Sequence, residues 1–228
     1  ILEGYGLTET SPVITVNRPN AFKLGTVGLP LDSVEVKLTD DGEILTRGPS
    51  VMVGYYKKET ETQQVLKDGW FHTGDIGHLD KDGFLKITDR KKDLIVTAGG
   101  KKISPQRIEG LLKANPIFLN AVVVGEGRPF VSALMVPQPE LVLQYAEKKG
   151  IEFRSYLQLL QSSEVKGFLL NEVQQTTTDL ASFEKVKKII LLEKDFSIES
   201  EELTPTLKVR RGVIEERFRR QLQALYEE

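Results

Sequence analysis

Six residues near the start of the chain combine chemical groups that suit a nucleotide. The segment Tyr5-Gly6-Leu7-Thr8-Glu9-Thr10 holds an aromatic ring, a glycine, two hydroxyls and a carboxylate. The Tyr5 ring can stack on a base, Gly6 allows close backbone approach, and Thr8 can bond a phosphate or carboxylate oxygen. Glu9 offers the hard oxygen ligand that Mg²⁺ prefers. A polar turn after a strand would explain the same residues, so this segment alone leaves both interpretations open.

Two charged motifs further along the chain could hold the sugar of such a nucleotide. Trp70-Phe71-His72-Thr73-Gly74-Asp75 places a carboxylate just after a glycine at a strand edge. Such a carboxylate can accept hydrogen bonds from ribose hydroxyls, although Asp75 could also simply cap a turn, and we assign His72 no role. The run Asp89-Arg90-Lys91-Lys92-Asp93 contains Arg90, a donor for ribose or phosphate. Charge runs of this kind are more often a solvated face.

Two later loops could serve phosphate chemistry. The paired glycines of Gly99-Gly100-Lys101-Lys102 can bring backbone amides close to a phosphate or pantetheine chain, or they can form only a hairpin turn. The segment Leu203–Arg211 is a proline-bearing loop that carries Lys208 towards the last helix. A flexible ammonium group can follow charge as it develops on a phosphoryl group. Most lysines are only solvated, so Lys208 by itself is not diagnostic.

The first part of the chain is predicted to position these groups with β-structure. Val34, Val36 and Leu38 alternate with polar residues, the period of a half-buried strand, and the turn Asp40-Asp41-Gly42 predicts a return strand. A short polar helix is expected at residues 58–66. Hairpins are predicted in succession at residues 34–46, 76–88 and 94–103. Three successive hairpins indicate a small barrel or a twisted antiparallel layer.

From Ser104 the pattern changes to helices mixed with strands. Ser104-Pro105 predicts a helix start, and Asn115-Pro116 predicts its end. Strands are expected at 119–124, 131–136 and 186–192, and helices at 140–149, over much of 156–181, and at 211–226. We therefore expect an α+β protein. It should have a small antiparallel β-barrel-like subdomain at 1–89, a compact domain of a small sheet packed with helices at 90–228, and a hinge about 89–93.

The composition excludes several classes of function. The 228 residues are 39% hydrophobic and 28% charged with a net charge of -2, which gives no reason to expect nucleic acid as a partner. The absence of cysteine excludes disulfides, thiolate metal sites and a cysteine nucleophile. No apolar run approaches the ~20 residues that span a bilayer, so membrane association is not evident. The chain opens at Ile1 without methionine, and we expect it to be a fragment.

Taken together, the motifs resemble the adenylate-forming superfamily of acyl-CoA synthetases, luciferases and peptide-synthetase adenylation domains. Four segments match its conserved motifs in order, and the resemblance covers the whole chain: Tyr5–Glu9, Thr73–Asp75, Asp89–Asp93 and Thr204–Arg210. The form Leu-Thr-Pro-Thr-Leu-Lys is most similar to long-chain fatty acyl-CoA synthetases. Two features depart from the pattern. The last motif lacks the glycine that precedes the lysine in many relatives, and the family's Ser/Thr/Gly-rich phosphate loop is nowhere in the sequence.

The resemblance implies roles for individual residues at an ATP site. Tyr5 would stack on adenine, with Gly6 beside it in the same motif. Thr8 would contact the phosphate or the acyl carboxylate, and Glu9 would help to hold Mg²⁺. Asp75 would accept the ribose hydroxyls.

Further roles follow for the rest of the chain. Arg90 would assist Asp75, Lys92 would be the hinge residue, and Lys208 would stabilise adenylate formation. The Gly99-Gly100 turn would face coenzyme A after the small domain rotates.

The implied activity is that of a long-chain fatty acid–CoA ligase that uses a fatty acid, ATP, Mg²⁺ and coenzyme A. The phosphate loop and the acyl tunnel would lie in a missing N-terminal portion, so this chain alone should be inactive. A cytoplasmic location is expected, with peripheral membrane association left open. The alternatives are another adenylate-forming enzyme, such as a peptide-synthetase adenylation domain or a luciferase-like oxygenase, and a non-catalytic nucleotide-binding module.

Overall fold

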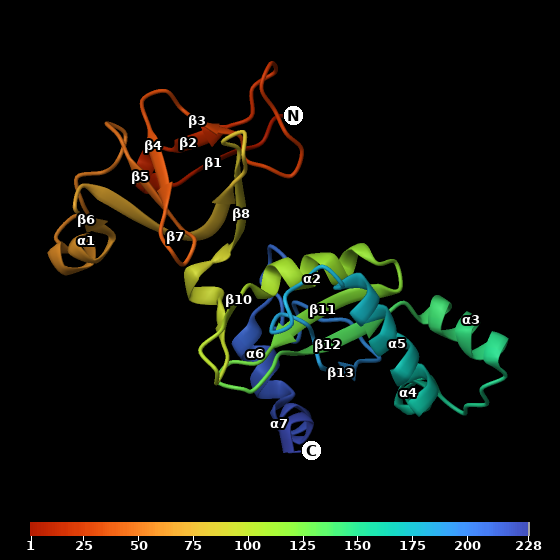
Figure 1. Cartoon of the computed structure of the whole chain (residues 1–228). Helices are drawn as coiled ribbons and strands as arrows, with labels where there is room; N and C mark the ends of the chain where they lie inside the picture. Colours follow the sequence, from red (N-terminus) through yellow and green to blue (C-terminus); the bar gives the residue numbers. More distant parts are fainter. Residues whose placement is uncertain (228) are drawn as a thin grey trace. The chain divides into compact units, whose positions relative to one another are not determined.

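The chain folds into two compact units, which divide between Asp93 and Leu94 (Figure 1). The structure is a computed structural model and describes residues 1–227. The first unit is almost entirely β, and the second combines helices with two small sheets. The expected α+β class is confirmed. None of the helices within residues 1–227 has the length and apolarity needed to cross a membrane.

The first unit consists of two antiparallel sheets. One has the order β1-β2-β3, and the other has the order β4-β5-β7-β6 with β8 paired to β7. The long strand β7 therefore pairs with three others, which makes it the organising strand of this unit. The strands are β1 (Gly4–Gly6), β2 (Val13–Val16), β3 (Leu29–Pro30), β4 (Glu35–Leu38), β5 (Glu43–Arg47), β6 (Leu66–Lys67), β7 (Trp70–Leu79) and β8 (Leu85–Arg90).

Burial explains why the central strands form. Ile44, Phe71 and Leu85 are almost fully buried and belong to β5, β7 and β8, so burying them favours this sheet. The first two predicted hairpins are confirmed as β4–β5 and β7–β8. The expected polar helix is α1 (Glu59–Val65), and two 3-10 turns complete the unit, η1 (Thr8–Thr10) and η2 (Lys91–Asp93).

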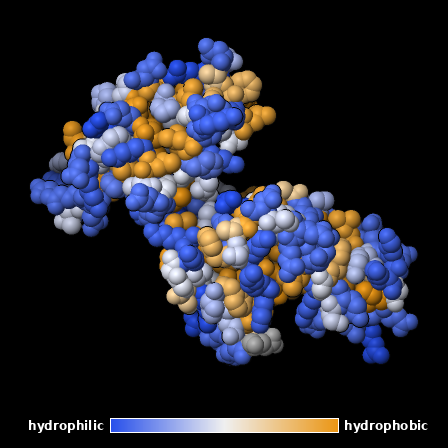
Figure 2. Space-filling view, viewed as in Figure 1, coloured by the Kyte–Doolittle hydropathy of each residue, from blue (hydrophilic) through white to orange (hydrophobic). Residues whose placement is uncertain are grey.

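The first unit also leaves apolar side chains uncovered. Apolar residues gather on its visible face in Figure 2. Its exposed large hydrophobic residues are Ile1, Leu2, Val13, Phe22, Leu24, Val53 and Tyr56. Phe22 and Tyr56 are 56% and 85% exposed. Several exposed large hydrophobics on one small unit are characteristic of a surface that another structure covers.

The second unit is built around the three-stranded sheet β11-β12-β13. Strands β11 and β12 are antiparallel, whereas β12 and β13 are parallel. The strands and helices of this unit are β9 (Ile95–Val96), β10 (Lys102–Ile103), α2 (Pro105–Ala114), β11 (Phe118–Val124), β12 (Ser132–Pro137), α3 (Pro139–Lys149), α4 (Tyr156–Gln161), α5 (Ser163–Thr176), β13 (Lys188–Leu191), α6 (Arg211–Arg217) and α7 (Arg219–Glu227).

Helices cover both faces of that sheet. In β11, Ala121 and Val123 belong to a core shared with α2, α3, α4 and α5, while Val122 and Val124 belong to a second core shared with α6 and α7. Successive side chains in a strand point to opposite faces, so one apolar run serves both cores. Every residue of β12 is buried for the same reason. The predicted small sheet packed with helices is confirmed.

The structure differs from the sequence-based expectations in two places. The third hairpin, β9–β10, does not extend the antiparallel layer of the first unit. It forms a separate two-stranded sheet whose Ile95 and Ile103 pack into the core of the second unit. The single helix predicted at 211–226 is two helices, because the backbone leaves helical values at Phe218 (φ -100°, ψ 16°). The Phe218 side chain packs against the second core.

Candidate functional site

Three residues predicted to hold the adenosine part of ATP meet around one carboxylate. The Tyr5 hydroxyl donates a hydrogen bond of 2.6 Å to Asp75 Oδ2. Arg90 Nε lies 2.7 Å from Asp75 Oδ1. The residues come from β1, β7 and β8, and Asp75 pairs with Arg90 in the β7–β8 register. Residues far apart in sequence therefore converge on the one predicted ribose acceptor.

The electrostatics of this cluster favour a fixed geometry. Asp75 is 3% exposed, so its carboxylate needs hydrogen-bond partners in place of bulk water. Burial, and then the hydrogen bond to Asp75, raise the pKa of the Tyr5 hydroxyl well above its ordinary value. The Tyr5 phenol therefore stays protonated, and can donate to Asp75, to a pH above the range in which an ordinary tyrosine ionises. A carboxylate has about four lone-pair positions, and Tyr5 and Arg90 occupy two of them, which leaves acceptor capacity for a ligand.

The backbone turn before Asp75 is fixed from strand β5. Thr73 Oγ1 donates to the Ile44 carbonyl at 2.8 Å and accepts from the Asp75 backbone N–H at 3.1 Å. Gly74 between them has φ +70°, a value that suits glycine. The glycine that the sequence motif places before the acid is therefore needed by the conformation of the turn.

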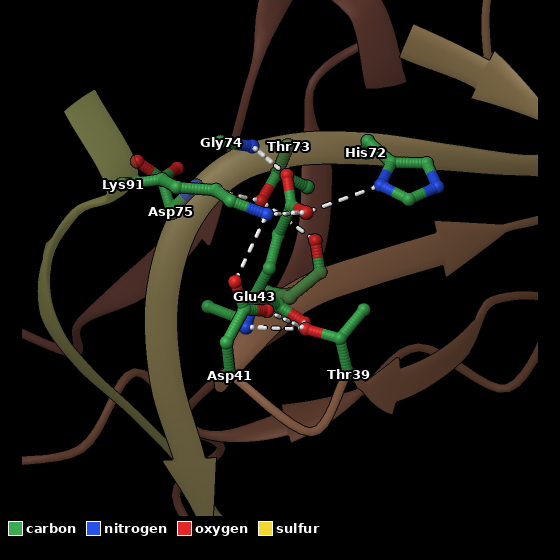
Figure 3. Close-up of polar contacts among 9 residues, drawn as sticks. Thr39, Asp41, Glu43, His72, Thr73, Gly74, Asp75 and Lys91 are labelled. Atoms are coloured by element: carbon green, nitrogen blue, oxygen red, sulfur yellow. Dashed lines mark hydrogen bonds and ion pairs between the residues drawn. The ribbon is translucent and has the colours of Figure 1, made fainter. Parts of the chain in front are cut away.

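Beneath this turn lies a network of charged groups that the sequence analysis did not assign to the site (Figure 3). Glu43 Oε2 is 2.8 Å from Lys91 Nζ and 3.1 Å from His72 Nδ1, and Glu43 Oε1 accepts from the Gly74 backbone N–H at 3.2 Å. Lys91 also pairs with Asp41 at 3.2 Å. The only sequence signal for this network is weak: a glutamate begins an apolar strand directly after a turn.

The predicted phosphate and metal residues lie on the 3-10 turn η1. Thr8 is exposed, and its side chain has the access that a ligand contact needs. Glu9 is half-buried, and its Oε1 accepts a 2.8 Å hydrogen bond from the Tyr55 hydroxyl. Gly6 has a structural reason to be glycine, because a Cβ there would lie 1.7 Å from the Pro12 carbonyl oxygen. No local sequence signal marks Tyr55, because its contact with Glu9 depends on the fold.

Lys92 and the paired glycines lie in exposed segments. Lys92 is in η2, the last turn of the first unit, and its side chain is exposed. Gly99 and Gly100 form the tip of the β9–β10 hairpin, with Gly100 at φ +72°. A Cβ at either glycine would meet nothing within 4 Å, so the hairpin tip is open to solvent or a ligand.

Lys208 lies on an ordered loop of the second unit. The Thr204 N–H donates to the Lys208 carbonyl at 2.8 Å, and the Lys208 N–H donates to Thr204 Oγ1 at 3.0 Å. Leu207 adopts φ +59°, which turns the chain just before the lysine. Arg211 then anchors the end of the loop, with its Nη1 2.8 Å from Glu109 Oε1. The Lys208 side chain is exposed, so an ordered loop presents its ammonium group to solvent or a ligand.

The fold and the motifs agree with comparisons of the sequence and structure. The long-chain-fatty-acid–CoA ligase FadD15 of Mycobacterium bovis is 40% identical over 227 residues, covering 99% of this chain and 38% of that protein. Long-chain-fatty-acid–CoA ligase 6 of Rattus norvegicus is 37% identical, covering 99% of this chain and 34% of its own length. The chain thus spans little more than a third of either relative.

A solved structure gives the same result. O-succinylbenzoate coenzyme A synthetase from Bacillus subtilis, in complex with AMP, superposes with a TM-score of 0.63 at 27% identity, covering 92% of this chain and 40% of that one. These similarities place the chain in the adenylate-forming superfamily and confirm the resemblance drawn from the motifs. Residues 1–56 match the AMP-binding enzyme family and residues 92–228 match its C-terminal domain. The chain belongs to the AMP-binding enzyme family.

Proposed function

We propose that this chain carries part of the nucleotide site, and the lid domain, of an ATP-dependent long-chain fatty acid–CoA ligase. The observation that carries the proposal is the convergence of Tyr5 and Arg90 on the buried carboxylate of Asp75. Similarity to fatty acid–CoA ligases over 99% of the chain supports the substrate class. The AMP complex of a related synthetase supports the nucleotide.

Asp75 binds the ribose in this proposal. Its two unused acceptor positions receive the ribose hydroxyls, while Tyr5 and Arg90 hold the carboxylate in place. A preorganised carboxylate loses little freedom when the ligand arrives, which favours binding. The Tyr5 ring offers a face to the adenine, and its hydroxyl keeps the ring oriented.

The reaction has two steps in the proposed enzyme. An oxygen of the fatty acid carboxylate attacks the α-phosphorus of ATP, and pyrophosphate leaves. The sulfur of coenzyme A then attacks the acyl carbonyl carbon, and AMP leaves. Lys208 stabilises the charge that develops in the first step, and Thr8 contacts the phosphate or the acyl carboxylate. The lid turns about Lys92 between the steps, and the Gly99-Gly100 tip then faces coenzyme A.

Glu9 is the proposed Mg²⁺ ligand. The Tyr55 hydroxyl donates to Glu9 Oε1, whereas the second carboxylate oxygen of Glu9 has no hydrogen-bond partner within residues 1–227. The same residues contain no group of three or more side chains that could hold a metal by themselves. One carboxylate fits Mg²⁺ in a nucleotide site, because this ion usually takes its other ligands from phosphates and water. The bound ion would neutralise phosphate charge.

The exposed apolar surface of the first unit is covered by the rest of the enzyme in this proposal. Residues such as Phe22, Leu24 and Tyr56 would otherwise remain exposed to water. The remainder would also supply the phosphate loop and the fatty acid site, which this sequence lacks. The isolated chain should therefore give no ATP–pyrophosphate exchange.

Release of AMP by the intact enzyme tests the proposal. When no other nucleophile is added, sustained AMP release should require fatty acid, ATP and coenzyme A together, and acyl-CoA should form in equal amount. Adding hydroxylamine in place of coenzyme A should trap the acyl-adenylate as a hydroxamate. Adenylation of fatty acid without any acyl-CoA product would instead indicate another adenylate-forming enzyme, and no adenylation of any carboxylic acid would indicate a binding module.

A further inference from the structure

Glu43 lies beneath the ribose-binding pair and contacts the chain next to both members. We propose that Glu43 is a positioning residue that sets the geometry of Asp75 and Arg90 through the Gly74 backbone and Lys91. The inference rests on the proposed function, because it assumes that Asp75 and Arg90 bind the nucleotide. Glu43 itself would touch neither substrate nor metal.

Both oxygens of the Glu43 carboxylate are committed to residues beside the site (Figure 3). Oε1 accepts from the Gly74 N–H at 3.2 Å, and Gly74 immediately precedes Asp75. Oε2 accepts from Lys91 Nζ at 2.8 Å, and Lys91 immediately follows Arg90. One carboxylate thus joins the two segments that present the ribose ligands.

The backbone hydrogen bonds of the sheet are irregular in these segments. The β5–β7 register shifts between Glu43 and Leu45, and the β7–β8 register shifts between Ile76 and Gly77. A register shift interrupts the regular ladder of backbone hydrogen bonds and bends the strand. The position of Asp75 is therefore not fixed by the ladder alone, and the Glu43 side chain supplies the missing backbone acceptor.

The charge balance of the network makes Glu43 a strong acceptor. Burial acts to raise the pKa of Glu43, but the hydrogen bonds from Lys91 and His72 outweigh it, and the pKa is lowered overall. The carboxylate is therefore ionised at neutral pH, and only 5% of the residue is exposed. Lys91 has a second partner in Asp41, so loss of Glu43 would draw Lys91 towards the β4–β5 turn.

A purely structural ion pair would also stabilise this hairpin, and the two roles differ in what they change. Replacing a positioning residue changes the affinity for the ligand that Asp75 binds and does not change the affinity for the other substrates. A stabilising residue alters the melting temperature and the fraction of active enzyme, but no particular Michaelis constant. The KM values for ATP, fatty acid and coenzyme A therefore separate them.

The experiment uses the intact enzyme with Glu43→Gln and, as a matched control, Glu35→Gln. Glu35 lies in the neighbouring strand β4 and makes an exposed ion pair with Arg47 at 2.7 Å, so its loss should change little. Glu43→Gln should raise the KM for ATP about tenfold and leave the KM for coenzyme A and fatty acid unchanged. Its effect on the KM for ATP should be smaller in an Asp75→Ala background, because the part that passes through Asp75 is already lost there.

A second variant covers the case in which Glu43→Gln does not fold. Lys91→Met should also raise the KM for ATP. Lys91→Arg keeps the positive charge, so its KM for ATP should stay close to the wild-type value. An unchanged KM for ATP in both Glu43→Gln and Lys91→Met, or equal additive effects with and without Asp75, would overturn the inference. Failure of the wild-type enzyme to release AMP would overturn the proposed function instead, so the two results are distinguishable.

Discussion

Replacing Asp75 with alanine removes the carboxylate on which the proposed nucleotide site depends. One lost interaction weakens ATP binding directly, because the ribose hydroxyls lose a charged acceptor, at a cost of about 1–3 kcal/mol. The Tyr5 hydroxyl also loses the partner that lies 2.6 Å away, but this bond is already made in the free enzyme, so its loss lowers mainly the stability of the fold. The Arg90 side chain is 49% exposed, so water compensates for its lost ion pair and this third loss is small.

The lost hydrogen bonds to the ribose thus set the loss of affinity. We therefore expect ATP binding to weaken by about 2 kcal/mol, which corresponds to a roughly 30-fold rise in the dissociation constant. Titration calorimetry of the intact enzyme with ATP measures this dissociation constant directly. The KM for ATP should rise with it, while the KM for fatty acid should not.

Asp82→Ala is the matched control. Asp82 belongs to the turn that joins β7 to β8, its side chain is 54% exposed, and it pairs with Lys23 at 3.1 Å. Its removal should leave ATP binding unchanged. If Asp75→Ala unfolds at the wild-type temperature and also keeps wild-type affinity and turnover, then Asp75 does not bind the ribose.

Three further predictions concern other parts of the chain. Lys208→Ala in the intact enzyme should slow acyl-adenylate formation by about 10²-fold or more while acyl-CoA formation from supplied acyl-adenylate stays near normal; equal loss in both half-reactions would remove the support for its proposed role. The hydrogen bond from Tyr5 should stabilise the fold fully below the ordinary tyrosine pKa of about 10, and this contribution should disappear as the pH rises through the raised value, because the phenol is then ionised. Because Tyr5 should still be protonated at pH about 10, ultraviolet titration should count the same number of phenolates there in the wild type and in Tyr5→Phe. A larger number in the wild type would contradict the raised pKa of Tyr5. Limited proteolysis should cleave the chain at 89–93 or at the Gly99-Gly100 tip before strand β12, and early cleavage within β12 would place the hinge elsewhere.

Local patterns were sufficient for most elements of this fold. The helix that begins after Ser104 formed where predicted, because a serine cap and a proline at the first helical position act within a few residues, and Ser104 accepts from the Arg107 N–H. The alternation of Val34, Val36 and Leu38 predicted a strand for the same local reason. The motif order also identified the family, because it depends on residue types and not on distances.

Other features depended on residues that are distant in the chain. The third hairpin joined the second unit because Ile95 and Ile103 are buried in its core, and no local signal says which core an apolar pair will enter. The break at Phe218 likewise follows from packing against the second core, whereas the helical periodicity of the sequence continues through it.

The candidate site divides in the same way. The sequence alone predicted a nucleotide site at Tyr5, Asp75 and Arg90, because the order of the motifs resembles a nucleotide-binding family, whereas each motif by itself also fitted a simpler interpretation. Only the tertiary structure decided that a phenol and a carboxylate 70 positions apart share a hydrogen bond, and that Glu43 contacts the chain beside Asp75. Burial makes such contacts necessary, because a carboxylate removed from water must find its donors in the fold, and sequence separation does not limit which donors those are.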